Sequence, residues 1–318
     1  LLGCHIKQLL PTTGYKGKVM HKHEHARDLQ SPNVQVFECH QRPSMKYGRN
    51  KPQKTCILLV AFGTSHLDAQ RAYDFIQEKA EQEFPETSIR WAYTSASIRK
   101  KLNKKGISSD SLPMALSRLI EEDFTHVAIQ PLHTIPGHEF DDISRTVSAF
   151  RHVPKGLKRI ALSSPLLLTE KDLGIVGHAL LKIIPAERKP EDAVIFIGHG
   201  SNHPSNSFYP ALAYWLQQQD PLIYMSTVEY WPDLEFTQKQ ILEQKPQKAF
   251  LLPFLTVAGD HARNDIAGDD ADSWKSVLEK DGYDCQAILK GIAEYEQFVE
   301  IWLDHLRLAV QTLDIKKK

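Results

Sequence analysis

Val194-Ile-Phe-Ile-Gly-His-Gly-Ser201 is an apolar run that ends in glycine and a hydroxyl residue, and Ile57-Leu-Leu-Val-Ala-Phe-Gly-Thr64 repeats that pattern in the first half of the chain. A second pair follows downstream. Gln130-Pro-Leu-His-Thr-Ile-Pro-Gly137 resembles Leu252-Pro-Phe-Leu-Thr-Val-Ala-Gly259, with proline, threonine and glycine recurring at one constant offset. Two matching pairs in the same order indicate that an α/β unit has been duplicated within this chain.

Short apolar strands alternate with amphipathic segments from residue 57 onward, which is typical of a parallel sheet with helices on both faces. The expected strands are 57–62, 88–94, 126–132 and 158–162 in the first half, and 193–198, 222–228, 248–254 and 284–288 in the second. Apolar residues spaced three to four apart predict helices over 69–84, 206–219, 233–245, 271–281 and 294–313. The sequence therefore predicts an α/β fold of two similar lobes that face each other across a cleft.

The lobes are expected at 55–185 and 186–318, because prolines 185 and 190 stand among charged residues between the last strand of the first half and the first strand of the second. Residues 1–54 are polar and aperiodic and predict a flexible leader.

The leader carries two features with competing interpretations. Leu-Leu-Gly-Cys4 fits the end of a bacterial lipoprotein signal, or it belongs to a truncated or disordered tail. The tract His21-Lys-His-Glu-His25 can hold transition metals, or it has no specific role. The sequence therefore leaves two cellular locations possible, the cytoplasm or a periplasmic, lipid-anchored location.

Composition narrows the class of partner. Lys plus Arg and Asp plus Glu both number 39 among 318 residues, so no basic field draws the chain to nucleic acid. No apolar stretch approaches the roughly 20 residues of a membrane span, and the four cysteines show no CxxC pairing. The absence of a Gly-x-x-x-x-Gly-Lys-Ser/Thr loop predicts no nucleotide cofactor. The sequence does not decide whether the chain forms a homo-oligomer.

Three metal-binding residue types follow three successive strands of the second half: His199, Glu229 and His261. The carboxyl ends of parallel strands meet at one edge of a sheet, so these side chains are expected to converge. Two imidazoles and one carboxylate suit Co²⁺, Ni²⁺, Fe²⁺ and Zn²⁺ and leave coordination positions open for a second partner. Taken singly, each residue also has a structural explanation. His199 could donate a hydrogen bond in a tight turn, Glu229 could cap a helix, and His261 could be a surface group at a helix end.

Five pieces of the sequence resemble the anaerobic-pathway sirohydrochlorin cobaltochelatase family, class II chelatases related to ferrochelatase. They are Leu59-Val-Ala-Phe-Gly-Thr-Ser65, Tyr93-Thr-Ser-Ala-Ser-Ile-Arg-Lys-Lys-Leu102, Gly198-His-Gly-Ser201, Val228-Glu-Tyr-Trp-Pro232 and Val257-Ala-Gly-Asp-His-Ala-Arg-Asn-Asp265. The likeness covers about residues 55–312 and includes Asp269-Asp-Ala-Asp-Ser-Trp-Lys275, whereas the leader departs from the family pattern.

The resemblance implies an ATP-independent chelatase that inserts Co²⁺ into sirohydrochlorin during cobalamin biosynthesis. It implies that His199, Glu229 and His261 bind the metal, and either histidine is a candidate for accepting a pyrrole proton. The substrate has a rim of carboxylates, for which cationic, hydroxyl and other polar side chains are the expected partners. These candidates are Ser65, Arg99, Lys100, His133, Ser201, Asn202 and Arg263. For His133, a place in the core or behind the contact residues is an equal alternative. Asp260 and Asp265 are expected either to orient His261 or to cap a helix.

Other functions remain open at this point. The same histidines would serve an exported protein that binds a metal or haem, or a chelatase for Fe²⁺ or Ni²⁺. A zinc hydrolase with the same three ligands is a further alternative.

Overall fold

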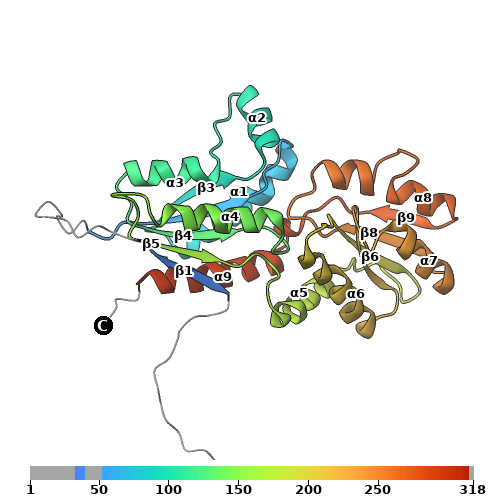
Figure 1. Cartoon of the computed structure of the whole chain (residues 1–318). Coiled ribbons are helices and arrows are strands. Elements are labelled where there is room, and N and C mark those ends of the chain that lie inside the picture. The colour runs from blue at the N-terminus through green and yellow to red at the C-terminus, as the bar shows by residue number, and fades with distance from the viewer. Residues whose placement is uncertain (1–32, 40–51, 315–318) are drawn as a thin grey trace, which may run out of the picture. The chain divides into compact units, whose positions relative to one another are not determined.

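Residues 33–39 and 52–314 are described by a computed structural model, and they form two parallel-stranded lobes with helices on both faces of each sheet (Figure 1). This architecture confirms the predicted fold class. The predicted features at Cys4 and His21–His25 lie outside the described residues.

The first sheet has the strand order β1-β5-β4-β2-β3, in which β1 runs antiparallel to β5 and all other neighbours are parallel. Its strands are β1 (Val34–Glu38), β2 (Thr55–Ala61), β3 (Ser88–Tyr93), β4 (His126–Pro131) and β5 (Arg159–Ser163). The helices of this half of the chain are α1 (Leu67–Glu83), α2 (Ala96–Lys104), α3 (Leu112–Glu121), α4 (His138–Phe150) and α5 (Glu170–Lys182).

The second sheet is wholly parallel and has the order β7-β6-β8-β9. Its strands are β6 (Ala193–Gly198), β7 (Ile223–Thr227), β8 (Lys248–Pro253) and β9 (Asp284–Ala287). Its helices are α6 (Phe208–Gln219), α7 (Leu234–Gln244) and α8 (Trp274–Lys280), with α9 (Glu296–Asp314) at the end of the chain and short turns of other helix types at Pro204–Ser207, Ala262–Ile266 and Ile292–Glu294. The order β3-β2-β4-β5 in the first lobe matches β7-β6-β8-β9 in the second, as a duplication requires.

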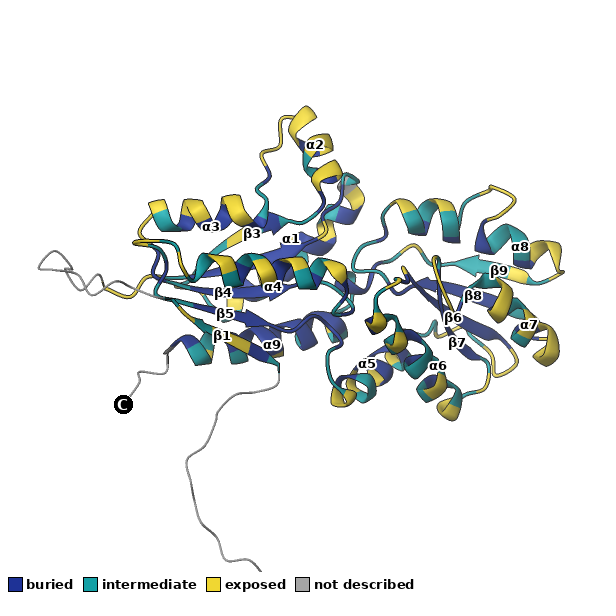
Figure 2. Cartoon of the chain, viewed as in Figure 1, coloured by how far each residue is buried: buried dark blue, intermediate teal, exposed yellow. Residues whose placement is uncertain are grey.

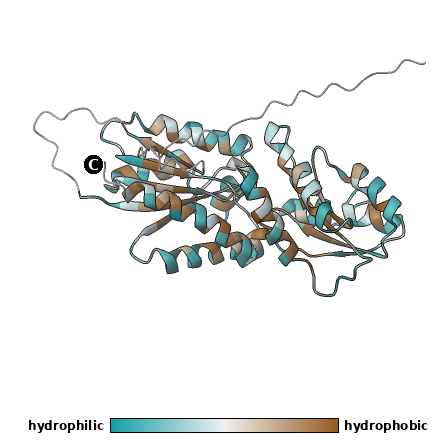
Figure 3. Ribbon diagram, turned by 90° about the horizontal axis from the view of Figure 1, so that it is seen from below, coloured by the Kyte–Doolittle hydropathy of each residue, from teal (hydrophilic) through white to brown (hydrophobic). Residues whose placement is uncertain are grey.

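The core follows from the two-residue period of the strands, which sends successive side chains to opposite faces of a sheet. In β2, Ile57 and Leu59 pack with α1 and α9, whereas Leu58 and Val60 pack with α3 and α4. All four are buried, since helices cover both faces. Figure 2 shows the dark blue strands enclosed by helices whose outer faces are exposed, and Figure 3 shows the same strands as predominantly hydrophobic.

The sequence prediction did not include helices α2, α3, α4 and α5. In addition, β1, α5 and α9 pack in a different part of the fold from the one predicted, with α5 against α6 of the second half. The strand β1 falls inside the segment 1–54 that was predicted as a leader; it pairs with β5 and buries Val34. Helix α9 falls in the predicted second lobe 186–318, but it packs against β4, β5 and β1 of the first sheet. Its apolar residues Trp302 and Leu306 join the same core cluster as Ile57, so burial against the first sheet determines where the helix lies.

The described part of the chain contains no helix with the length and apolar character that crossing a membrane requires.

Candidate metal centre

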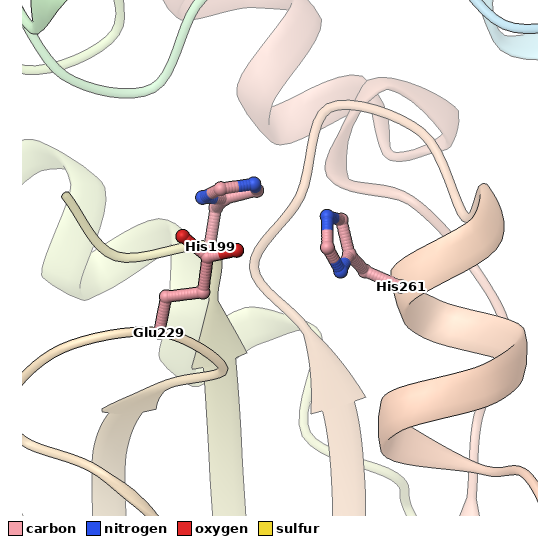
Figure 4. Close-up of side chains that lie close together, drawn as sticks. All are labelled: His199, Glu229 and His261. Atoms are coloured by element: carbon pink, nitrogen blue, oxygen red, sulfur yellow. The ribbon is translucent and has the colours of Figure 1, made fainter.

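Three loops at the carboxyl edge of the second sheet position the predicted metal ligands. His199 directly follows β6, Glu229 lies just beyond β7, and His261 precedes the helical turn at Ala262–Ile266. One possible ligand atom from each residue lies within 4.8 Å of those from the other two (Figure 4). Residues distant in sequence therefore converge at one point, as the succession of parallel strands predicted.

Backbone contacts hold the first two ligands together. The amide of Glu229 donates to the carbonyl of His199 at 2.8 Å. Gly200 between these loops has φ +84°, and a Cβ there would lie 1.6 Å from the carbonyl oxygen of Glu229. Only glycine fits this position, because it tolerates positive φ and lets the two backbones approach each other.

Hydrogen bonds to the ring nitrogens determine which nitrogen each histidine presents. The Nδ1 of His199 lies 2.9 Å from the carbonyl oxygen of Gly200, and the Nδ1 of His261 lies 2.8 Å from Oδ2 of Asp265. A carbonyl or carboxylate oxygen only accepts, so each Nδ1 carries the proton and donates. Metal binding requires an imidazole in its neutral form, in which Nε2 is then the lone pair available to the ion.

The trio is accessible from outside. His199 and Glu229 are exposed and His261 is partly exposed, and the two imidazole rings lie 4.6 Å apart between centroids at an interplanar angle of 86°. Three protein ligands on an exposed wall leave coordination positions free. The arrangement suits an ion that must be captured and released, more than one that is permanently enclosed.

A cavity of about 470 Å³ adjoins the trio, and residues of both lobes line it. Its walls combine apolar side chains, among them Phe62, Ile98, Ile135 and Val257, with hydroxyl and amide groups. Five histidines line it, namely His66, His133, His138, His199 and His261, together with the acids Glu139, Glu229 and Asp260. Within residues 33–39 and 52–314, no lysine or arginine belongs to this lining.

The predicted substrate contacts divide into two groups. Ser65, His133, Ser201 and Asn202 line the cavity, whereas Arg99, Lys100 and Arg263 do not. Arg99 instead donates to the carbonyls of Tyr93 and Thr94 at the end of β3. Arg263 forms an ion pair with Asp68 of α1, with 3.5 Å between Nη2 and Oδ2. Both guanidinium groups therefore hold parts of the protein together.

His133 is a neutral member of the lining. Both of its ring nitrogens are shielded from solvent and have no hydrogen-bond partner among the residues that the structure describes. Burial lowers the pKa of His133 to about 4, because an imidazolium ion there would lose its hydration. The ring is therefore uncharged at neutral pH.

The two candidate acids beside His261 have different partners. Asp265 accepts from His261, but Asp260 accepts from Nε2 of His66 in the first lobe at 2.5 Å and lies 3.7 Å from Nζ of Lys101. The hydrogen bond from His66 holds the pKa of Asp260 below its usual range. Asp265 is thus placed to orient the imidazole, whereas Asp260 connects the lobes beside it.

Several lining residues escaped the sequence analysis: Phe62, His66, His138 and Tyr230. His138 reaches across the lobes, with its Nε2 2.8 Å from Oδ1 of Asn202. For Phe62 a signal existed, since it aligns with His199 in the internal repeat. Tyr230 adjoins Glu229, and its exposure inside the cavity depends on the loop conformation, which includes a positive φ of 65°.

Comparison with known proteins gives a consistent result. The model of the cobalt chelatase (CbiK) family matches residues 55–311. The chain is 39% identical over 272 residues to the sirohydrochlorin cobaltochelatase CbiKC of Nitratidesulfovibrio vulgaris, covering 85% of this chain and 96% of the relative. It is 31% identical over 259 residues to the sirohydrochlorin cobaltochelatase of Salmonella typhimurium, covering 81% of this chain and 97% of the relative.

Solved structures share the fold at low sequence identity. SirB from Bacillus subtilis with Fe³⁺ is 17% identical with a TM-score of 0.54, covering 82% of this chain and 97% of that chain. CbiX, titled the terminal enzyme for biosynthesis of siroheme in denitrifying bacteria, is 15% identical with a TM-score of 0.51, covering 80% of this chain and 99% of that chain. With a family model that matches most of its length and relatives above 30% identity, the chain belongs to the cobalt chelatase (CbiK) family.

Proposed function

We propose that this chain is an ATP-independent chelatase that inserts Co²⁺ into sirohydrochlorin, with His199, Glu229 and His261 holding the ion before transfer. The observation that carries the proposal is the convergence of these three side chains within 4.8 Å on the wall of a cavity between two lobes. Membership of the cobalt chelatase family supports the reaction, and the names of the two curated relatives support the substrate pair.

Metal delivery needs a site that strips water from the ion but does not retain it. Two Nε2 lone pairs and one carboxylate supply three ligands, which suits the borderline group to which Co²⁺ belongs. The remaining coordination positions are open to the cavity, where pyrrole nitrogens would replace the protein ligands one at a time. The partial exposure of the trio supports release, since no closed shell has to be broken.

Metal insertion also requires the loss of two pyrrole protons. His199 or His261 is the proposed acceptor, because each becomes free once the ion has left its Nε2. Asp265 would stabilise the cationic form of His261 through the bond at Nδ1. The Nδ1 of His199 instead donates to the neutral carbonyl of Gly200.

The tetrapyrrole is proposed to occupy the cavity, with its ring against the apolar residues and its carboxylates toward Ser65, Ser201 and Asn202. His133 remains a proposed contact, for which one of its shielded ring nitrogens would have to turn toward the cavity. Arg99 and Arg263 remain proposed contacts of the substrate rim. Each would have to exchange its present partner, the end of β3 or Asp68, for a carboxylate of the substrate.

The test is turnover by the purified full-length protein. Cobalt and sirohydrochlorin are mixed with the protein, and the absorption change of the tetrapyrrole is compared with the spontaneous rate. Parallel reactions use Fe²⁺ and Ni²⁺ as competing metals and protoporphyrin as a contrasting acceptor, with His261→Ala as the control that lacks one ligand. A rate equal to the spontaneous rate for every metal would refute the chelatase function, and a protein that binds metal without inserting it would be the remaining interpretation.

A further inference from the structure

The backbone around the metal ligands has a fixed hydrogen-bond pattern in the second lobe. The amide of Val228 donates to the carbonyl of Gly198 at 2.9 Å, and the amide of Glu229 donates to His199 at 2.8 Å. Gly200 follows with a positive φ of 84°. Together these features direct the side chain that follows β6 into the cavity.

The first lobe repeats this pattern bond for bond. The amide of Thr94 donates to the carbonyl of Ala61 at 2.9 Å, and the amide of Ser95 donates to Phe62 at 3.2 Å. Gly63 follows with a positive φ of 101°. Phe62 therefore occupies the place of His199, and Ser95 occupies the place of Glu229.

The third ligand has its counterpart as well. Gly137 and Gly259 each donate to the carbonyl two residues earlier, at 2.9 and 3.0 Å, and each precedes a helical segment. Glu139 and His261 both stand two residues after these glycines and both line the cavity. The first lobe thus keeps the backbone of a metal site but carries phenylalanine, serine and glutamate where the second carries histidine, glutamate and histidine.

Phe62 is one of several exposed apolar residues of the first lobe, and it differs from Ile107 and Met114 because it lines the cavity. Its side chain is 49% exposed although it lines the cavity, where the buried Ile98 and Ile135 are its apolar neighbours in the lining. A single exposed apolar side chain is common on a protein surface. At the wall of a cavity, however, an uncovered aromatic ring is a hydrophobic contact surface for the molecule that enters.

We propose that Phe62 packs against the face of the tetrapyrrole opposite to the face that receives the metal, an inference that rests on the proposed function. Phe62 comes from the first lobe and the three ligands come from the second, so a planar ring between the lobes has one of these groups on each side. A phenyl ring supplies stacking area and no lone pair, so it holds the macrocycle without competing for the ion. The repeat therefore explains why one lobe binds metal and the other positions the ring.

The experiment compares Phe62→Ala, Phe62→Leu and Phe62→Tyr with the wild-type protein. Binding of metal-free sirohydrochlorin is titrated through its absorption or fluorescence, and Co²⁺ binding is measured separately without tetrapyrrole. Phe62→Ala should raise the Kd for sirohydrochlorin about tenfold, which corresponds to about 1.4 kcal/mol, with Phe62→Leu intermediate and Phe62→Tyr close to wild type. Affinity for Co²⁺ should be unchanged in all three, which a general loss of structure would not allow.

Met114→Ala is the matched control, because Met114 is 48% exposed on α3 and does not line the cavity. Wild-type affinity for sirohydrochlorin in Phe62→Ala, or an equal loss in Met114→Ala, would overturn the assignment of Phe62. Failure of the proposed function would be recognised differently, by absence of cobalt insertion in the wild-type protein.

Discussion

Replacing Asp265 tests directly whether His261 presents Nε2 to the metal ion. Asp265 does not belong to the trio, but its Oδ2 accepts from Nδ1 of His261 at 2.8 Å. The bond fixes both the tautomer and the ring orientation. Asp265→Asn retains an oxygen that can accept the hydrogen bond but removes the charge, whereas Asp265→Ala removes both.

The expected losses follow from this geometry. Outer partners of metal-binding histidines typically contribute 10- to 100-fold in affinity. The side chains of His261 and Asp265 are 40% and 46% exposed, so solvent screens part of the charge, and the charge and the orienting hydrogen bond are expected to contribute comparable shares of the effect. We expect Co²⁺ affinity to fall about tenfold in Asp265→Asn and toward 100-fold in Asp265→Ala, or about 1.4 and 2.8 kcal/mol.

The assay is calorimetric titration of each variant with Co²⁺ at constant ionic strength, with the melting temperature recorded to verify folding. Asp272→Asn serves as the control, because Asp272 is an exposed acid of the same region that lies outside the trio and the cavity lining. Wild-type affinity in Asp265→Ala would refute the orienting role. An equal loss in Asp272→Asn would assign the effect to the overall charge of the surface.

Three further perturbations have defined outcomes. Glu229→Gln keeps the shape of a ligand but not its charge, so Co²⁺ affinity should fall by at least about tenfold while sirohydrochlorin affinity changes less; the reverse order in the two titrations would reassign the residue. Removal of residues 1–39 should lower the melting temperature relative to removal of residues 1–32, by roughly 2–4 °C per kcal/mol lost, because only the longer deletion removes β1; equal melting temperatures would contradict this. The pKa of His133 is about 4 in the folded protein and about 6.5 when unfolded, so the unfolded state takes up the proton first and stability falls as the pH drops through 6.5 until it levels off below 4. The free energy of unfolding, measured with urea, should therefore fall between pH 7 and pH 4 by about 3 kcal/mol less in His133→Gln than in wild type. Equal decreases in the two proteins would refute the burial of an uncharged ring.

The regular elements of the two sheets were largely predictable from sequence. Strands such as β2 and β6 are buried on both faces, so they are continuous apolar runs that end abruptly at glycine. The expected strands at 57–62 and 193–198 are observed as Thr55–Ala61 and Ala193–Gly198. The helix expected over 294–313 is observed as Glu296–Asp314.

Elements whose position depends on distant partners were not predictable. The strand β1 is a short edge strand whose only fully buried residue is Val34, so its sequence has no long apolar run. The apolar stripe of α9 predicts a helix, but periodicity cannot tell which of two similar sheets that stripe will cover. Tertiary contacts decide that β1 pairs with β5 and that α9 packs against the first sheet.

The same distinction applies to the site. His199, Glu229 and His261 were predicted together because parallel topology alone brings successive strand ends to one edge. Arg99 and Arg263 were expected at the cavity, but long side chains reach in several directions, and both found partners elsewhere. His66 was missed because its partner, Asp260, lies in the other half of the chain.

The packing of α9 has a consequence for biosynthesis. The helix buries Trp302, Leu306 and Leu313 together with residues of the first sheet, yet it follows the strands of both sheets in the order of the chain. The first sheet is therefore synthesised before the helix that covers it, and one apolar face of the sheet stays uncovered while more than a hundred further residues are polymerised. During that interval the nascent chain would offer a hydrophobic face to chaperones, and a stop codon shortly before residue 296 would release a product that cannot mature.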